Sequence, residues 1–344
     1  MLLTSLKQRY KREKSVLKSK QELMTKPYST TNVWGKIFEW SFKITILTFF
    51  SFLILLPFYF MLEQALVDPR FYEGQGFQIA WWPFDFDKFI AANKEFSGFL
   101  GTKLFFSNFK GAIQEGYLQS LLFTAGFATI SVIVRLFFAI TLGYALSMKN
   151  WMGKNVFFAI LLSLIVIPEI TLISLQYTLV SKAGWLGTKN PLILIAMIVP
   201  FATSIFNAYM YRNSFEAIPN SVKESSMLDG ASGVKYFFNI ALPMVKATTW
   251  TVIILTAIAS WNSYTWPALL WDSAPGPTAG YYAPINLWLF TTGRHEVAPG
   301  QIQIVLSVRM AATVLAVAPM IIVYFILRNK IMSAISRRGT ATKG

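Results

Sequence analysis

The chain has 344 residues, of which 54% are hydrophobic and 14% are charged, and its formal net charge at pH 7 is +15. So apolar a composition excludes a water-soluble globular protein of this size and predicts an integral membrane protein. The basic residues gather at the two ends and in short loops beside hydrophobic segments, which indicates the positive-inside distribution of membrane proteins and argues against a nucleic-acid-binding surface.

Six hydrophobic segments follow a basic tail at residues 1–36, and each is long enough to cross about 30 Å of hydrocarbon as a helix. They are Ile44–Leu62, Tyr117–Met148, Val156–Val180, Leu192–Tyr211, Met244–Leu270 and Ile304–Leu327. With the tail inside the cell, both termini are cytoplasmic. The charge bias agrees with this orientation at every loop except the outer loop that carries Lys182 and Lys189.

The predicted fold is therefore an all-α integral membrane protein with six transmembrane helices. Its parts are the basic tail at 1–36, the first transmembrane helix at 37–63, an extracytoplasmic loop at 64–116, a five-helix core at 117–332 and a cytoplasmic C-terminal tail at 333–344. The core includes a polar insert at 213–243, between the fourth and fifth hydrophobic segments.

The polar insert carries the most informative pattern in the sequence. Ser221 lies three residues before Glu224, which predicts a capping box and the start of a short helix. Gly230 suits the left-handed conformation that ends such a helix. Ser232 can cap a second helix, which continues until Pro243 interrupts the backbone hydrogen bonds. We therefore expect a helix, a glycine corner and a second helix outside the bilayer.

Two motifs resemble those of ABC importer permeases. The insert resembles the EAA loop of that family, with Ser-Ser in place of the usual Ala-Ala, through Glu224, Ser225, Ser226, Asp229, Gly230 and Pro243. In the family this loop is a coupling helix that docks on a cytoplasmic ATPase subunit. A second run is similar to a motif in the fifth core helix of carbohydrate-type permeases, and it reads Trp261-Asn262-Ser263-Tyr264 followed by Trp266-Pro267. The length and the six segments resemble the maltose-type "G" permease.

The resemblance implies the type I ABC importer permease fold in the inner membrane of a prokaryotic cell. The implied partners are a second permease of the maltose "F" type, two cytoplasmic ATPase subunits and an extracytoplasmic solute-binding protein. ATP and Mg are expected in the ATPase subunits, because this chain has no Gly-rich loop followed by Lys and Ser or Thr. We expect no cofactor or metal in the chain itself, which has no cysteine and a single histidine, His295.

Two charged residues lie inside the predicted helices, Arg135 in the second and Glu169 in the third. A charge near the middle of a bilayer costs at least about 2 kcal/mol unless it faces protein, water or a partner. Counted from the turn between these helices, both residues lie at a depth of about 20 Å. They can form a buried ion pair, or each can face a water-filled cavity separately. Pro168 frees a backbone carbonyl and predicts a kink in the third helix.

Aromatic and polar residues near the fifth helix are suited to a sugar, since rings stack on its C–H face and amides bind its hydroxyls. The candidate pathway residues are Trp261, Asn262, Tyr264, Trp266 and, in the sixth helix, Arg309. Packing against the partner subunit and an interfacial aromatic belt explain the aromatic residues equally well, and Arg309 can reach the membrane surface. The outer loop at 271–303, with Tyr281 and Tyr282, resembles the family's loop that enters the solute-binding protein.

The leading hypothesis is the permease subunit of an ATP-driven, solute-binding-protein-dependent importer for a sugar or oligosaccharide. Energy would enter from the ATPase through Glu224–Gly230. The alternative is an ion-gradient-driven secondary transporter that uses Glu169 as a proton carrier, although the sequence shows no repeated halves. A membrane enzyme would need clustered catalytic carboxylates, histidines or metal ligands near the helices, and the sequence lacks them.

Overall fold

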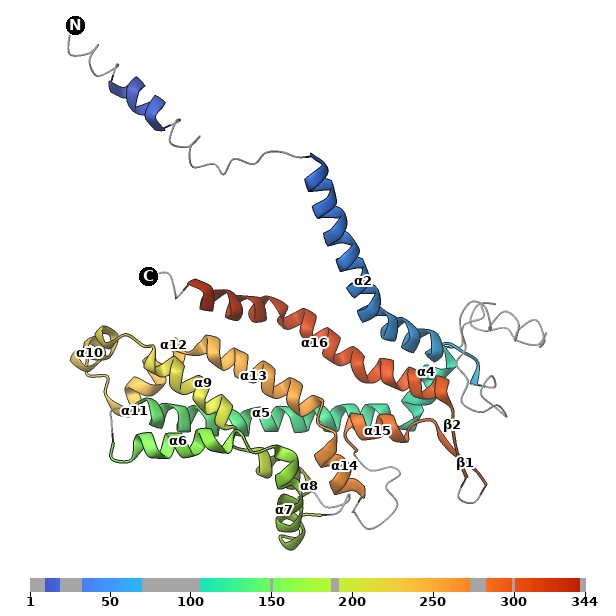
Figure 1. The fold of residues 1–344 in the computed structure, drawn as a ribbon. Helices are drawn as coiled ribbons and strands as arrows, with labels where there is room; N and C mark the ends of the chain where they lie inside the picture. The colour runs from blue at the N-terminus through green and yellow to red at the C-terminus, as the bar shows by residue number, and fades with distance from the viewer. Residues whose placement is uncertain are drawn as a thin grey trace. The chain divides into compact units, whose positions relative to one another are not determined.

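The computed structural model describes residues 10–18, 33–69, 106–148, 151–186, 192–272, 283–298 and 301–340 (Figure 1). Within these ranges the regular structure is helical, apart from one two-stranded antiparallel sheet. The chain divides into two compact units, Met1–Tyr59 and Phe60–Gly344.

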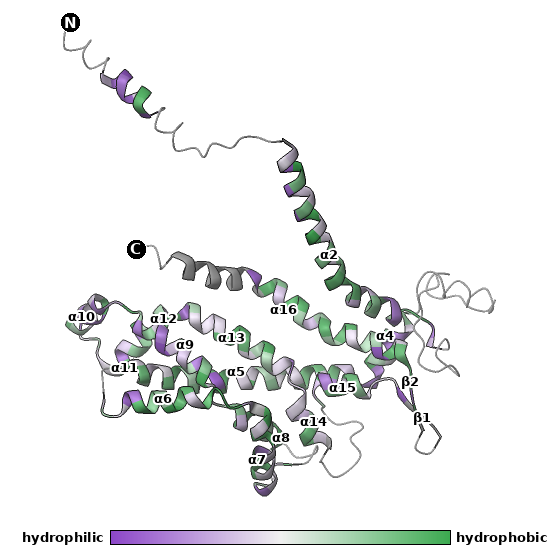
Figure 2. Cartoon of the chain, viewed as in Figure 1, coloured by the Kyte–Doolittle hydropathy of each residue, from purple (hydrophilic) through white to green (hydrophobic). Residues whose placement is uncertain are grey.

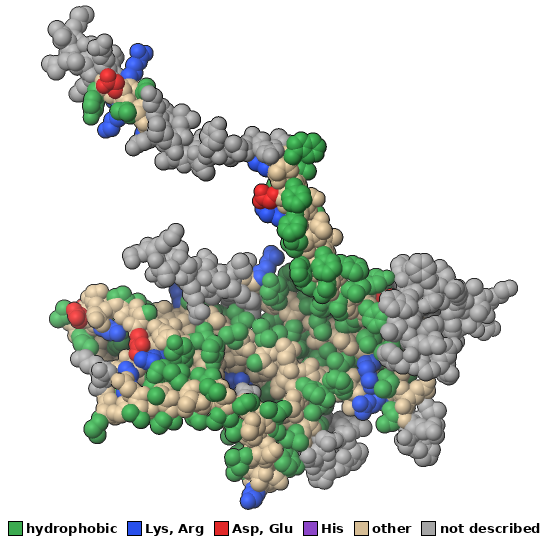
Figure 3. All heavy atoms as spheres, in the orientation of Figure 1, with side chains coloured by type: hydrophobic (Ala, Val, Ile, Leu, Met, Phe, Trp, Pro, Cys, Tyr) green, Lys and Arg blue, Asp and Glu red, His purple; other side chains and the backbone are tan. Residues whose placement is uncertain are grey.

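The first unit holds a helix at residues 10–18 and most of α2, which spans Val33–Ala65. Hydrophobic side chains are exposed along α2 from Trp34 to Tyr59, as the space-filling view shows (Figure 3). A helix that is apolar around its whole circumference needs an apolar solvent. The predicted first transmembrane segment, Ile44–Leu62, lies within this helix.

The second unit contains the remaining helices and the sheet. They are α4 (Ser107–Ala112), the π-helix η3 (Ile113–Tyr117), α5 (Leu118–Ser147), α6 (Lys154–Leu164), α7 (Glu169–Lys182), α8 (Ile193–Ile198), the 3-10 helix η4 (Val199–Phe201), α9 (Ile205–Glu216), α10 (Asn220–Leu228), α11 (Gly233–Tyr236), the π-helix η5 (Phe237–Ala241), α12 (Leu242–Met244), α13 (Lys246–Trp261), α14 (Thr265–Asp272), α15 (Ile285–Thr291) and α16 (Leu306–Thr340), with strands β1 (Arg294–Ala298) and β2 (Gln301–Ile304). Figure 1 shows α10 at one end of the long helices and the β1–β2 hairpin at the other.

Three helical segments of the described chain are long and apolar enough to cross a membrane, Trp34–Ala65, Ser107–Ser147 and Leu306–Ile326. Figure 2 shows hydrophobic residues along these helices. Two bent pairs raise the number to five if each pair is one span: Ile193–Phe201 with Ile205–Glu216, bent by 52°, and Gly233–Met244 with Lys246–Trp261, bent by 72°. The protein is therefore multi-helical and membrane-spanning in character, while the count of six stays a prediction.

Several of the predicted hydrophobic segments are interrupted. The third segment is broken between the end of α6 at Leu164 and the start of α7 at Glu169. Pro168 directly precedes α7 in an extended conformation, so the predicted kink at this proline is confirmed. The fourth segment changes to a 3-10 turn that contains Pro200, and the fifth stops at Trp261 before α14 begins at Thr265. The last two breaks were not predicted.

Helix α5 packs against α9 and α13 at the centre of the second unit. The closest approach is at Gly143, where an added Cβ would lie 2.5 Å from Cβ of Tyr211 and 2.8 Å from the carbonyl oxygen of Ala208. Tyr211 is fully buried, and it belongs to a hydrophobic cluster with Ala139 and Phe215. The two helices are therefore in near-backbone contact, which only glycine permits at this position.

Replacing Gly143 with alanine places a methyl group against α9 that no side-chain rotation can relieve, because the carbonyl of Ala208 belongs to the backbone. We expect Gly143→Ala to lower the free energy of unfolding by about 1–3 kcal/mol. The matched control is Gly126→Ala in the same helix, where no atom lies within 4 Å of the added Cβ. Thermal unfolding in detergent should show a loss of stability for Gly143→Ala and none for Gly126→Ala. Equal losses of stability in the two variants would contradict this packing.

A cluster of charged residues joins α6 to α9. Arg212 Nε donates to Glu216 Oε1 at 3.0 Å, and Lys154 Nζ lies 3.9 Å from the same oxygen. The Lys154 side chain is only 9% exposed, and its Nζ also donates to the carbonyl oxygen of Met148 at 2.9 Å. The Arg212 guanidinium lies 3.9 Å from the ring centre of Phe158 in α6. Glu216 therefore balances two cations where the α5–α6 turn meets the end of α9.

Removing the charge of Glu216 leaves the nearly buried Lys154 ammonium without this carboxylate. We expect Glu216→Gln to lower the free energy of unfolding by about 1–2 kcal/mol, because a poorly hydrated cation loses its counter-charge. The matched control is Glu39→Gln, which removes an exposed ion pair with Lys43 on α2 and should cost at most about 0.5 kcal/mol. The losses of stability in the two variants are compared by thermal unfolding. Equal losses would refute a structural role for Glu216.

Candidate functional site

The first candidate site is the segment formed by α10 and α11. Helix α10 begins at Asn220 with Pro219 at its N-cap position, so Ser221 lies inside the helix. The predicted capping box of Ser221 and Glu224 is therefore wrong. The physical reason is that Pro219, with its fixed φ, occupies the N-cap position two residues before Ser221. Ser232 does occupy the N-cap position of α11 in an extended conformation, but its side chain accepts no capping hydrogen bond.

The glycine corner after α10 is confirmed. Gly230 has a φ of +70°, its N–H donates to the carbonyl oxygen of Met227 at 3.1 Å, and the N–H of Ala231 donates to that of Ser226 at 2.8 Å. These two bonds form a Schellman motif, which requires a left-handed residue. Pro243 lies in α12, and the helix breaks two residues later at Val245, close to the predicted interruption.

The residues that resemble the EAA loop divide into an exposed set and one buried member. Glu224, Ser225 and Asp229 are exposed, whereas Ser226 is buried and donates to the carbonyl oxygen of Lys223 at 2.7 Å. The exposed face also contains two large apolar side chains, Met227 and Leu228, the latter 90% exposed. Sequence reasoning did not single them out, although two apolar residues at the end of a short polar helix are the signal that could have done so.

The second candidate site is a pocket of about 440 Å³ among the membrane-spanning helices. It is lined by Phe127 and Arg135 of α5, Ile170 and Ile173 of α7, Met197 of α8, Phe201 of η4, Ala259 and Ser260 of α13, the turn Asn262, Ser263 and Tyr264, and Thr265 and Trp266 of α14. The breaks in the fourth and fifth hydrophobic segments contribute Phe201 and the turn at Asn262 to the lining. Near the third break, the lining begins at Ile170, the second residue of α7.

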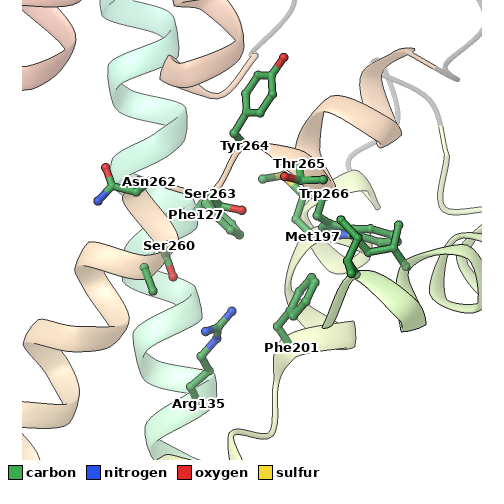
Figure 4. Close-up of a pocket in the computed structure, with 13 residues that line it drawn as sticks. Phe127, Arg135, Met197, Phe201, Ser260, Asn262, Ser263, Tyr264, Thr265 and Trp266 are labelled. Carbon is green, nitrogen blue, oxygen red and sulfur yellow. The ribbon is translucent and has the colours of Figure 1, made fainter. Parts of the chain in front are cut away.

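Three of the five predicted pathway residues line the pocket: Asn262, Tyr264 and Trp266 (Figure 4). Trp266 is buried, and its Nε1 donates to the carbonyl oxygen of Ala196 at 3.1 Å, so it fixes the start of α14 against α8. Tyr264 is more exposed, and its ring centre lies 4.9 Å from that of Phe290. Of these two aromatic residues, Trp266 therefore has a structural role, whereas Tyr264 is accessible.

The other two predicted pathway residues lie elsewhere. Trp261 packs against the cluster that contains Ile285 and Trp288. Arg309 donates from Nη2 to the carbonyl oxygen of Phe290 at 3.1 Å and from Nε to that of Thr292 at 3.4 Å. Arg309 thereby satisfies the carbonyl groups at the end of α15.

A residue of α15 holds the turn that supplies much of the pocket. The side-chain Nδ2 of Asn286 donates to the carbonyl oxygen of Trp261 at 2.9 Å and to that of Ser263 at 3.2 Å. Trp261 is the last residue of α13, where a helix leaves its final carbonyl groups without backbone partners, and Ser263 lies in the turn that follows. Asn286 therefore fixes the path of the chain from α13 into α14.

The predicted ion pair of Arg135 and Glu169 stays a prediction. Arg135 lies within α5 and faces the pocket, and Glu169 is the first residue of α7, directly before the pocket residue Ile170. The side chain of Glu169 lies outside the described residues, as do Tyr281 and Tyr282 of the predicted binding-protein loop. The described part of that outer region contains α15 and the β1–β2 hairpin.

Comparisons with known proteins agree with these features. The family model "Binding-protein-dependent transport system inner membrane component" matches residues 135–337. A probable ABC transporter permease protein of Mycoplasma pneumoniae is 38% identical over 307 residues, or 88% of each chain. The arabinooligosaccharides transport system permease protein AraQ of Halalkalibacterium halodurans is 28% identical over 41% of this chain and 49% of its own length.

The fold is similar to that of a solved structure. A chain in the crystal structure of a bacterial ABC transporter involved in the import of the acidic polysaccharide alginate aligns with a TM-score of 0.64 at 20% identity. The alignment covers 89% of this chain and 99% of the solved chain. The family match and the relative at 38% identity show that the chain belongs to the family of binding-protein-dependent transport system inner membrane components, the permease subunits of ABC transporters.

Proposed function

We propose that the chain is the permease subunit of an ATP-driven importer for a sugar or oligosaccharide, and that α10 is its coupling helix. The observation that carries the proposal is the exposed face of α10, with Met227 and Leu228 between Glu224 and Asp229. Exposed apolar side chains rimmed by polar ones are typical of a docking surface for another protein. Neither side chain has a partner within its own helix that would bury it.

The docking partner is a cytoplasmic ATPase subunit, two of which would bind ATP and Mg. Family membership implies a second permease, ATPase subunits and a solute-binding protein as the other components. We place α10 and both termini in the cytoplasm and propose a second permease of the maltose "F" type. The sugar assignment is supported by the arabinooligosaccharides in the name of the AraQ relative and by the aromatic and hydroxyl side chains of the pocket.

The position of α10 suits the transfer of force. Residues 217–219 connect it to the end of α9, which packs along α5, and α5 lines the pocket. The Schellman turn at Gly230 leads into α11 and the bend before α13, which also ends at the pocket. A displacement of α10 by the ATPase is therefore passed to both sides of the pocket through short connections.

The backbone at Gly230 offers one test of this coupling. No atom lies within 4 Å of a Cβ added there, so a substitution acts through its positive φ alone. We expect Gly230→Val to lower the ATP hydrolysis stimulated by the binding protein at least about tenfold, because a β-branched residue is strained in this conformation. Gly230→Asn is the control, since asparagine tolerates positive φ. Equal activity of the two variants in the reconstituted complex would count against the role of this turn.

The exposed apolar face offers a second test. Leu228→Asp should leave folding unchanged, because the side chain is 90% exposed, and should weaken ATPase binding at least about tenfold by placing a charge in an apolar contact. Met152→Asp is the matched control, since Met152 is fully exposed in the α5–α6 turn and lies outside α10. The measurement is co-purification of the ATPase subunits with the chain. Normal ATPase binding by Leu228→Asp would refute the docking surface.

A further inference from the structure

The helix at residues 10–18, called the basic helix below, presents a row of cations. All of its side chains are exposed, and its one acidic residue is Glu13. Its basic residues are Lys11, Arg12, Lys14 and Lys18. The three lysines are spaced by three and four residues, so they lie along one side of the helix. Figure 3 shows Lys and Arg side chains projecting from this part of the chain. The basic helix therefore carries an excess of positive charge that is concentrated on one side.

Apolar side chains border this row of lysines. Tyr10 is 67% exposed and Leu17 is 65% exposed. They are seven residues apart, which is about two helical turns, so they lie on the same side of the helix. The Nζ atom of Lys14 lies 6.0 Å from the ring centre of Tyr10, so the aromatic ring adjoins the cations. Lysines beside aromatic and aliphatic side chains are typical of helices that lie in a membrane interface.

The chain connects the basic helix to a membrane-spanning segment. From Lys18 to the start of α2 at Val33 there are about 15 residue steps, which span at most about 50 Å when fully extended. Near its start, α2 exposes Trp34 and Trp40, and tryptophan is enriched where a bilayer meets water. The connection therefore keeps the basic helix close to the bilayer surface, which raises the effective concentration of that surface.

The charge and the apolar side chains together favour a lipid surface as the partner. Residues 1–36 contain nine basic and two acidic residues, so the flanking sequence adds to the positive charge. A nucleic acid would match this charge, but its phosphate backbone offers no apolar layer to Tyr10 and Leu17. A bilayer with anionic lipids offers phosphate groups for the lysines and an apolar layer directly beneath them.

We propose that the basic helix lies flat on the bilayer that α2 crosses and binds anionic phospholipids there. Lys11, Lys14 and Lys18 contact the phosphate groups, while Tyr10 and Leu17 enter the interface. The attraction is reversible by salt, because the surface potential of a bilayer decays within a Debye length. The proposal concerns this chain and the lipid alone, so it goes beyond the proposed transport function and does not depend on it.

The chain has no cysteine, so Leu17→Cys supplies a single attachment point for an environment-sensitive nitrobenzoxadiazole fluorophore. The labelled chain is placed in nanodiscs of phosphatidylcholine, with or without phosphatidylglycerol. We expect a blue-shifted emission, and quenching by spin-labelled lipids, in the nanodiscs that contain phosphatidylglycerol, and the loss of both effects in concentrated sodium chloride. Equal emission and equal quenching in the two kinds of nanodisc would overturn the proposal.

The charge of the lysines is tested by combining Lys11→Gln, Lys14→Gln and Lys18→Gln. We expect the ratio of membrane-bound to unbound fluorophore to fall at least about tenfold, since each cation near an anionic surface contributes about fivefold. The matched control places arginine at the same three positions, which keeps the charge, and lysine, arginine and glutamine have similar helix propensities. The arginine variant should bind as the natural sequence does. Equal binding by the glutamine and arginine variants would overturn the proposal.

The control position for the fluorophore is Met152→Cys, which is fully exposed in the α5–α6 turn. Its emission should not respond to the lysine substitutions, and a response there equal to that at position 17 would overturn the assignment to the basic helix. ATPase subunits and an oligonucleotide are each added to nanodiscs of phosphatidylcholine alone. We expect neither to shift the emission at position 17. A shift that requires one of them, and not phosphatidylglycerol, would overturn the lipid proposal and identify that partner instead.

Discussion

The close contact of α5 and α9 at Gly143 is the constraint on which the rest of the second unit depends. It allows the two helices to approach until the backbone of α9 meets α5, and the fully buried Tyr211 closes the contact. Toward one end, α9 leads through residues 217–219 into the exposed α10. Toward the other, α5 presents Arg135 and Phe127 to the pocket. The exposed α10 and the pocket are therefore both attached to the same closely packed pair of helices.

Local chemistry made part of this fold predictable. The long apolar segments reveal α2, α5 and α16, and the left-handed turn at Gly230 follows from the residues on either side of it. The break at Pro168 was also readable, because a proline removes a hydrogen bond wherever it stands in a helix. Pro200 carries the same signal for the stop at Phe201, although that break was not predicted. The stop at Trp261 has no such signal, since it depends on how α13 and α14 pack around a cavity. Hydropathy counts apolar residues and does not register such interruptions.

The candidate sites show the same limit. Asn262, Tyr264 and Trp266 meet in one pocket largely because they are neighbours in the sequence. Ser260 and Phe201 line the same pocket as Arg135 but come from other helices, and no pattern in the sequence predicts that they lie together. Trp261 belongs to the same motif but packs against the cluster of Ile285 and Trp288, because one residue along a helix turns the side chain by about 100°. Arg309 was chosen for its charge, whereas its hydrogen bonds join α16 to the end of α15.

The hydrogen bonds of Asn286 make the shape of the pocket depend on a residue outside its lining. It does not line the pocket, yet its amide holds the carbonyl groups of Trp261 and Ser263 and so sets the course of the turn that does. A replacement there would shift the pocket wall without altering any side chain that lines the cavity. The shape of the pocket can therefore change through a residue outside it, and a survey confined to the cavity lining would overlook the cause.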